Sequence, residues 1–120
     1  MVNEHGKAIY RNQDIMGASP IRLIIMTYDV AILACEREDI KKAIDAVSLL
    51  RDSLNLDIHE SSEGFLRLYQ WCLECIRERD FSSAHGVLTE LREAWISVEA
   101  RGEASMPAPT LSRNLLVAAA

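Results

Sequence analysis

The sequence contains little of what turns, disulfide frameworks and sheets require. Its 120 residues include only 5 Gly, 3 Pro and 3 Cys. Because Gly and Pro punctuate local structure, their scarcity favours long uninterrupted elements. An odd and sparse set of cysteines excludes a disulfide framework and indicates reduced core side chains in a reducing compartment. No segment alternates apolar and polar residues with the period of a strand.

Positive charge is also scarce. Lys and Arg number 13 against 18 Asp and Glu, so the net charge is −5. Nucleic-acid binding relies on Lys and Arg that neutralise phosphates, so this balance argues against a nucleic-acid partner and, more weakly, against an anionic membrane surface. The apolar run Ile21–Cys35 is interrupted by charge and is too short to span a bilayer. Residues 1–14 lack the apolar stretch of a secretory signal, and we expect a cytoplasmic protein.

Four segments repeat apolar residues at the spacing of an α-helix. They run from Pro20 to about Arg37, from Ile40 to near Leu56, from Ser61 or Ser62 to near Arg79, and from Asp80 to about Val98. Ser19 before Pro20, and Asp80, have the residue types of helix N-caps. Helices of similar length, about 17–20 residues, joined by short connections predict an all-α, antiparallel up-and-down four-helix bundle.

The predicted bundle occupies residues 19–100. Residues 1–18 form a polar N-terminal arm that would cap the bundle. Residues 101–120 begin with a Gly-, Ser-, Ala- and Pro-rich linker and end in a flexible apolar C-terminal tail.

The first predicted helix has more apolar surface than one bundle helix needs. Its polar residues Arg22, Asp29 and Glu36 are seven apart and form one narrow stripe. A bundle helix normally buries one apolar stripe, and a large leftover apolar face usually marks a binding site. Either this helix is the most central one, or the arm, the tail, a second copy or a foreign partner covers it. Asp29 belongs either to a solvated stripe or to the edge of a groove.

No motif of a catalytic or metal site is present. Cys72 and Cys75 form a Cys-x-x-Cys pair within a predicted helix, but a zinc site needs two more ligands, and His59 and His85 lack ligand-like spacing to the pair. A redox pair would open a helix after a strand. There is no Gly-rich phosphate loop, nucleophile elbow or His-Glu-x-x-His motif. The sequence therefore predicts a non-enzymatic protein without metal or cofactor.

Several groups of residues resemble the flagellin export chaperones, the FliS family. They are Tyr10-Arg11-x-Gln13, Ala18-Ser19-Pro20, Leu23-Ile24-x-Met26-x-Tyr28-Asp29, Leu68-Tyr69 and Leu91-Arg92-Glu93-Ala94-Trp95. The resemblance covers about residues 9–98 and implies an antiparallel four-helix bundle with a capping segment. It also implies a cytoplasmic chaperone that uses no ATP. Such a chaperone binds the C-terminal segment of new flagellin, which becomes helical, prevents its premature polymerisation and presents it for export.

The resemblance also has departures. Val30 stands where the family usually has Gly. The intervals Asp29–Asp39 and Tyr69–Trp95 are each shorter than the family pattern by about two helical turns, which implies a variant bundle trimmed at one end.

By resemblance, eight residues are candidates for partner binding. They are Ile9, Tyr10, Ser19, Pro20, Leu23, Ile24, Tyr28 and Asp29. Ser19 and Pro20 also have a structural interpretation, as the helix cap and the first helical residue. Tyr10 has a structural interpretation too, as a lid over the groove. Three alternatives stay open. They are a homodimer that buries the spare face of the first helix, a regulator that sequesters another flagellar or translational factor, and a metal enzyme.

Overall fold

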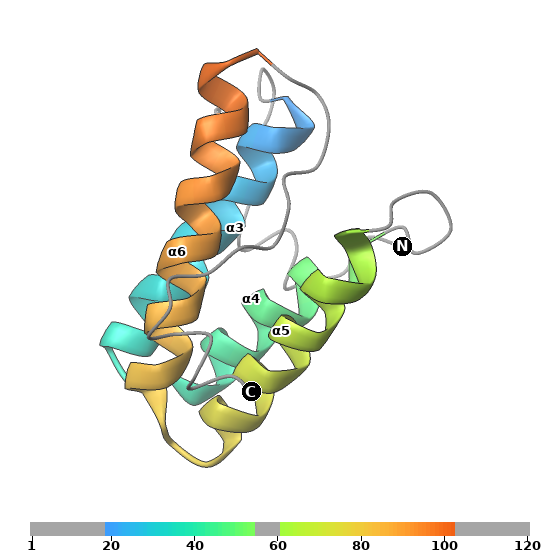
Figure 1. The fold of residues 1–120 in the computed structure, drawn as a ribbon. Helices are drawn as coiled ribbons and strands as arrows, with labels where there is room; N and C mark the ends of the chain where they lie inside the picture. Colours follow the sequence, from blue (N-terminus) through green and yellow to red (C-terminus); the bar gives the residue numbers. More distant parts are fainter. Residues whose placement is uncertain (1–18, 55–60, 103–120) are drawn as a thin grey trace, which may run out of the picture.

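The computed structural model describes residues 19–54 and 61–102 (Figure 1). These residues form four helices and no strand: α3 (Pro20–Glu36), α4 (Ile40–Asp52), α5 (Ser61–Arg77) and α6 (Phe81–Ala100). The all-helical prediction is confirmed for this part of the chain, and four helices are compatible with a four-helix bundle. The predicted arm and nearly all of the predicted tail lie outside the described residues.

Each helix packs mainly against two others. α3 contacts α4 and α6, and α5 contacts the same two helices. In Figure 1, α3 and α6 form one side-by-side pair, and α4 and α5 form a second pair. The short α3–α4 and α5–α6 connections lie at the same end of the molecule.

The helix starts follow from local capping. The Ser19 hydroxyl accepts a hydrogen bond from the Arg22 backbone N–H at 3.1 Å, with Pro20 as the first helical residue. Asp39 and Asp80 cap α4 and α6 in the same way, each at 3.2 Å. A side-chain oxygen at this position satisfies one of the free N–H groups of the first turn.

The two short connections share one backbone design. Glu38 and Arg79, each directly before a capping aspartate, adopt the left-handed region with φ of 54° and 64°. The capping residue's N–H then donates to a carbonyl five residues back, from Asp39 to Ala34 and from Asp80 to Cys75. These bonds close the preceding helix. A non-glycine residue at positive φ is uncommon, and nothing in the sequence indicated it.

α4 differs from the prediction. It has 13 residues, against 17, 17 and 20 for α3, α5 and α6, so the prediction of similar lengths is wrong for this helix. The Ser53 hydroxyl donates to the Leu50 carbonyl at 2.7 Å. Serine side chains that bond the backbone in this way compete with helix continuation, and α4 ends at Asp52.

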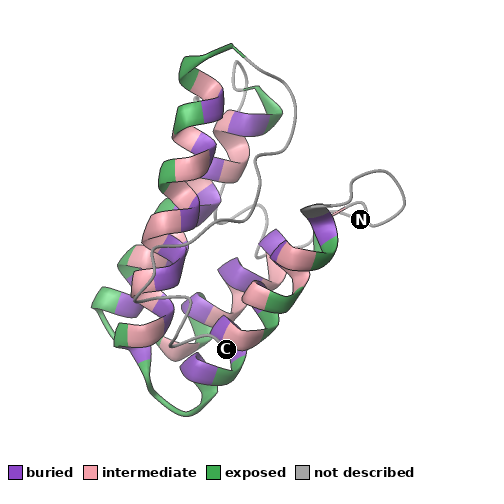
Figure 2. Cartoon of the chain, viewed as in Figure 1, coloured by how far each residue is buried: buried purple, intermediate pink, exposed green. Residues whose placement is uncertain are grey.

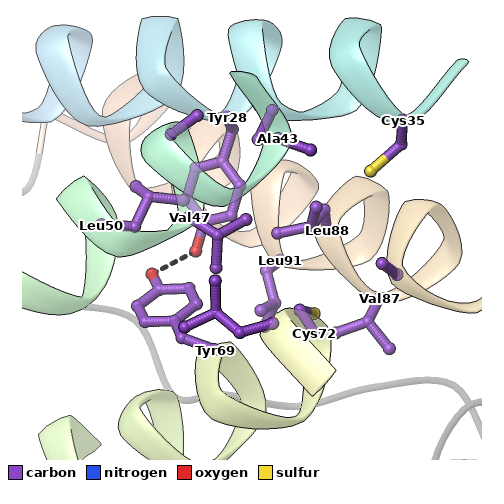
Figure 3. Packing of buried hydrophobic residues seen from close by; sticks show 14 of the residues in the cluster. Tyr28, Cys35, Ala43, Val47, Leu50, Tyr69, Cys72, Val87, Leu88 and Leu91 are labelled. Atoms are coloured by element: carbon purple, nitrogen blue, oxygen red, sulfur yellow. Dashed lines mark hydrogen bonds between the residues drawn. The ribbon is translucent and has the colours of Figure 1, made fainter. Parts of the chain in front are cut away.

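One contiguous core fills the interior. Figure 2 shows that each helix carries buried residues along one side. Ala31, Ala34, Ala43 and Ala46 are at most 2% exposed, so α3 and α4 both contribute small side chains to this core. Figure 3 shows the larger residues packed between the helices.

An aromatic group links three helices at the centre of this core. The hydroxyls of Tyr28 on α3 and Tyr69 on α5 lie 2.5 Å apart and point toward one another (Figure 3). The Trp95 indole N–H on α6 donates to the Tyr28 hydroxyl at 3.2 Å. Phe65 packs against Tyr69 and Trp95, with ring centroids 5.9 and 5.7 Å apart. Burial raises the pKa of both tyrosines, which keeps their hydroxyls protonated.

The polar stripe of α3 forms a ladder with α6, made of two ion pairs and one carboxylate–histidine hydrogen bond. Arg22 pairs with Glu99, Asp29 with Arg92 at 2.5 Å, and Glu36 with His85 at 2.8 Å. Each step of seven residues forward on α3 is matched by a step of seven backward on α6. The two helices therefore run in opposite directions, and the stripe faces α6.

The ladder predicts a measurable coupling between Asp29 and Arg92. We expect Asp29→Arg and Arg92→Asp each to lower the free energy of unfolding by about 0.5–1 kcal/mol, because each places like charges together at a half-exposed site. The double variant restores the attraction in reversed order and should recover most of the loss. Urea denaturation measures all three. Additive losses in the double variant would contradict the ladder, and high salt should shrink the coupling.

Candidate functional site

Most large apolar side chains pack into the core or onto it, and those that do not are concentrated on one face. Among the described residues, five large aliphatic side chains belong to neither the core nor the layer packed on it: Leu23, Met26, Leu33, Leu49 and Leu66. Four of the five lie on α3 and α4. Leu33 is 44% exposed. Leu23 and Leu33 of α3 and Leu49 of α4 line pockets along the boundary between α3 and α4, which we call the α3/α4 groove.

A pocket of about 340 Å³ lies where α3 begins and α4 ends. It is lined by Pro20, Leu23, Ile24, Thr27, Leu49, Leu50 and Ser53. Two of these residues carry hydroxyls, but the Thr27 hydroxyl donates to the Leu23 carbonyl at 2.9 Å and the Ser53 hydroxyl to that of Leu50. Because both hydroxyls are engaged with backbone, the lining is predominantly apolar.

A second pocket of about 110 Å³ lies nearer the α3–α4 connection. It is lined by Val30, Leu33, Ala34, Arg37, Asp39 and Lys42. The α3 residues of the two pockets follow one another at steps of three and one, so they share one side of the helix. The two pockets therefore lie along one boundary between α3 and α4, and their lining from Pro20 to Arg37 spans about 25 Å at the helical rise per residue.

Of the eight residues predicted to bind a partner, three line this groove. Pro20, Leu23 and Ile24 all belong to the larger pocket. Ser19 is exposed at the start of α3, where its hydroxyl caps the helix.

Two of the predicted residues point away from the groove. Tyr28 is 0% exposed and faces the core. Asp29 lies on the α6 side of α3, paired with Arg92. Ile9 and Tyr10 lie outside the described residues, so the structure does not place them.

The α4 side of the groove was missed by sequence reasoning. Leu49 and Ser53 line the larger pocket, and Lys42 lines the smaller one. A signal was present, because Leu49 is the one large apolar residue of α4 outside the stripe formed by Ile40, Ile44, Val47 and Leu50. An apolar residue off the main stripe indicates a second contact face.

The three cysteines are confirmed as buried and free. Burial, with a contribution from the Glu36 charge, raises the pKa of the Cys35 thiol from 9.0 to about 11. Burial, with the nearby acidic side chains led by Asp80, raises the pKa of Cys75 to about 11 as well. Burial also raises the pKa of Cys72. Thiolates are the reactive species, so these thiols are protected near neutral pH.

Alkylation kinetics test this protection. At pH 8 we expect iodoacetamide to label the folded protein about 100-fold more slowly than the unfolded protein, with the rate rising about tenfold per pH unit toward pH 11. A cysteine that reacts in the folded protein at the unfolded rate would contradict the prediction.

The same shifts affect stability in a defined direction. The folded thiols hold their protons up to a higher pH than the unfolded ones, so stability should fall as pH rises from about 9 to 11.

Comparisons with protein-family models, with curated proteins and with solved structures each gave no match for this chain. In the helices that the structure describes, none is long and apolar enough to cross a membrane. Within residues 19–54 and 61–102, no three His, Cys, Asp or Glu side chains are grouped so that they could hold a metal ion.

Proposed function

We propose that this protein is a chaperone of the flagellin export type, which holds the C-terminal segment of flagellin as a helix in the α3/α4 groove. The observation that carries the proposal is that Leu23, Leu33 and Leu49, which do not belong to the core, line pockets of one groove. Contiguous apolar surface on a small protein marks an interaction site. The residues that line the larger pocket include Pro20, Leu23 and Ile24, from the segment that resembles the chaperone family.

The proposed recognition is that of an amphipathic helix in an apolar groove. A groove about 25 Å long accommodates about 16 helical residues. Flagellin's terminal segment would order on binding, and its apolar face, once covered, is withheld from polymerisation. In this proposal the four helices form an antiparallel up-and-down bundle, residues 1–18 cap it and residues 101–120 form a flexible tail. The protein acts in the cytoplasm without catalysis or cofactor.

Calorimetry with the C-terminal segment of flagellin from the same organism tests the proposal. We expect a one-to-one complex, a gain in helicity by circular dichroism and a negative heat-capacity change from apolar burial. A scrambled segment of the same composition serves as the control. If the native segment does not bind at tens of micromolar, or binds no better than the scrambled one, the proposal fails.

A homodimer is the second candidate function, in which the pairing of two copies serves a structural or regulatory role. Leu23, Met26, Val30 and Leu33 on α3 are spaced by three, four and three residues. The spacing is the same when it is read from either end of the helix. Two α3 helices that pack antiparallel about a twofold axis would therefore place Leu23 of one copy opposite Leu33 of the other. Sedimentation equilibrium decides between the candidates. A concentration-dependent dimer that Leu33→Glu dissociates supports this one, and a monomer at all concentrations excludes it.

A further inference from the structure

Two basic side chains lie at one end of the α3/α4 groove. Arg37 and Lys42 both line the smaller pocket. Among the described residues, neither side chain takes part in an ion pair. Asp39 also lines this pocket, but its carboxylate caps α4 by accepting the Lys42 backbone N–H. The lining therefore carries a net positive charge in a protein whose overall charge is −5.

The other charged residues near this end of the groove do not line the smaller pocket. Glu36 points to the other side of α3, where it pairs with His85 at 2.8 Å. Lys41 is engaged by Asp45 at 3.0 Å. Glu38 is exposed in the connection and does not line the pocket.

The opposite end of the groove is uncharged. None of the residues that line the larger pocket is ionisable. The nearest charge on α3, Arg22, is paired with Glu99 on α6. The groove thus has the larger, apolar pocket at one end and the smaller pocket, with its two basic side chains, at the other.

The distance between the two ends sets a register for a docked helix. The larger pocket centres near Leu23 and Ile24 and the smaller one near Leu33 and Ala34. Ten residues of helix rise about 15 Å, so a helix lying along α3 would place side chains i and i+11, which share one face, in the two pockets. The pockets differ threefold in volume, about 340 against 110 Å³, which favours a bulky residue in the first and a small one in the second.

We infer that the α3/α4 groove selects an amphipathic helix with a bulky apolar residue, a smaller apolar residue three turns away, and a carboxylate one turn beyond the smaller residue. The carboxylate pairs with Arg37 and Lys42 and orients the helix along the groove. This inference rests on the proposed function, because it specifies the sequence of the segment that the groove holds. Complementary charge at a groove end sets orientation and partner choice more than total affinity.

Four synthetic helical peptides test the inference on the full chain. Two carry Leu, then Val three turns later, then Glu or Gln one turn beyond. The other two carry the reverse order, because the docked helix can run in either direction. In one order we expect the Glu peptide to bind about three to ten times more tightly than its Gln partner. That advantage should vanish in Arg37→Gln/Lys42→Gln and persist in Lys41→Gln, the matched control, which removes a neighbouring charge that does not line the groove.

The outcomes separate the two proposals. If Glu and Gln peptides bind equally in both orders, or if the Glu advantage survives in Arg37→Gln/Lys42→Gln, the carboxylate pairing is refuted while the groove stands. If none of the four peptides binds, the groove itself is refuted, and with it the proposed function. Circular dichroism of each variant checks that the fold is unchanged.

Discussion

Leu49→Glu is expected to weaken binding of the flagellin C-terminal segment about 30-fold or more. Leu49 lines the larger pocket of the α3/α4 groove and does not belong to the core. A carboxylate there would have to be desolvated beneath the docked helix, and a central apolar anchor would be lost, each of which costs about 1–3 kcal/mol. Since the side chain is only half-buried in the free protein, stability should change by less than about 1 kcal/mol.

Leu66→Glu is the matched control for this variant. Leu66 is the remaining large apolar side chain outside the core among the described residues, and it lies on α5, away from both pockets. The same chemical change there should leave binding within about twofold. Calorimetry measures the affinities and urea denaturation the stabilities. Equal weakening by both variants would locate the binding surface elsewhere, and undiminished binding by Leu49→Glu would remove the groove from the interaction.

Tyr28→Phe is expected to lower the free energy of unfolding by about 2–4 kcal/mol, and Tyr69→Phe by only about 1–2 kcal/mol. The Tyr28 hydroxyl bonds both the Tyr69 hydroxyl and the Trp95 indole N–H. Its removal therefore breaks both of these hydrogen bonds. Removing the Tyr69 hydroxyl breaks only one of them, and Tyr28 keeps its bond from Trp95.

Chemical denaturation of the two single variants and the double variant measures this order. Because Tyr28→Phe has already broken the bond between the hydroxyls, adding Tyr69→Phe removes an unpaired group and should cost little more. A larger effect for Tyr69→Phe than for Tyr28→Phe would show that the network is centred on α5 instead. Near-ultraviolet circular dichroism establishes whether each variant keeps a packed core.

The helix starts could be predicted because their causes are local. Ser19, Asp39 and Asp80 cap the N–H groups of residues three positions away, and capping depends on little else. The early end of α4 could not be predicted from periodicity, because Leu54 continues the apolar spacing. Ser53 ends the helix through a bond to the Leu50 carbonyl.

The candidate site was predicted in part. Pro20, Leu23 and Ile24 were identified from the chain that forms α3, and they line the larger pocket. Leu49 and Ser53 come from α4, about 25 residues later in the chain, and only helix packing places them opposite Leu23. Tyr28 belongs to the same segment as Leu23, but its side chain points into the core.

By itself, the sequence determined that this protein is helical, where its helices begin, and that α3 carries more apolar surface than one bundle stripe. Periodicity shows which residues share a helix face, but it does not show which neighbour covers that face. The tertiary structure decided that the Arg22–Asp29–Glu36 stripe faces α6 and that Leu23 of α3 and Leu49 of α4 line the same pocket. Those contacts depend on how helices far apart in the chain pack together, which no local pattern encodes.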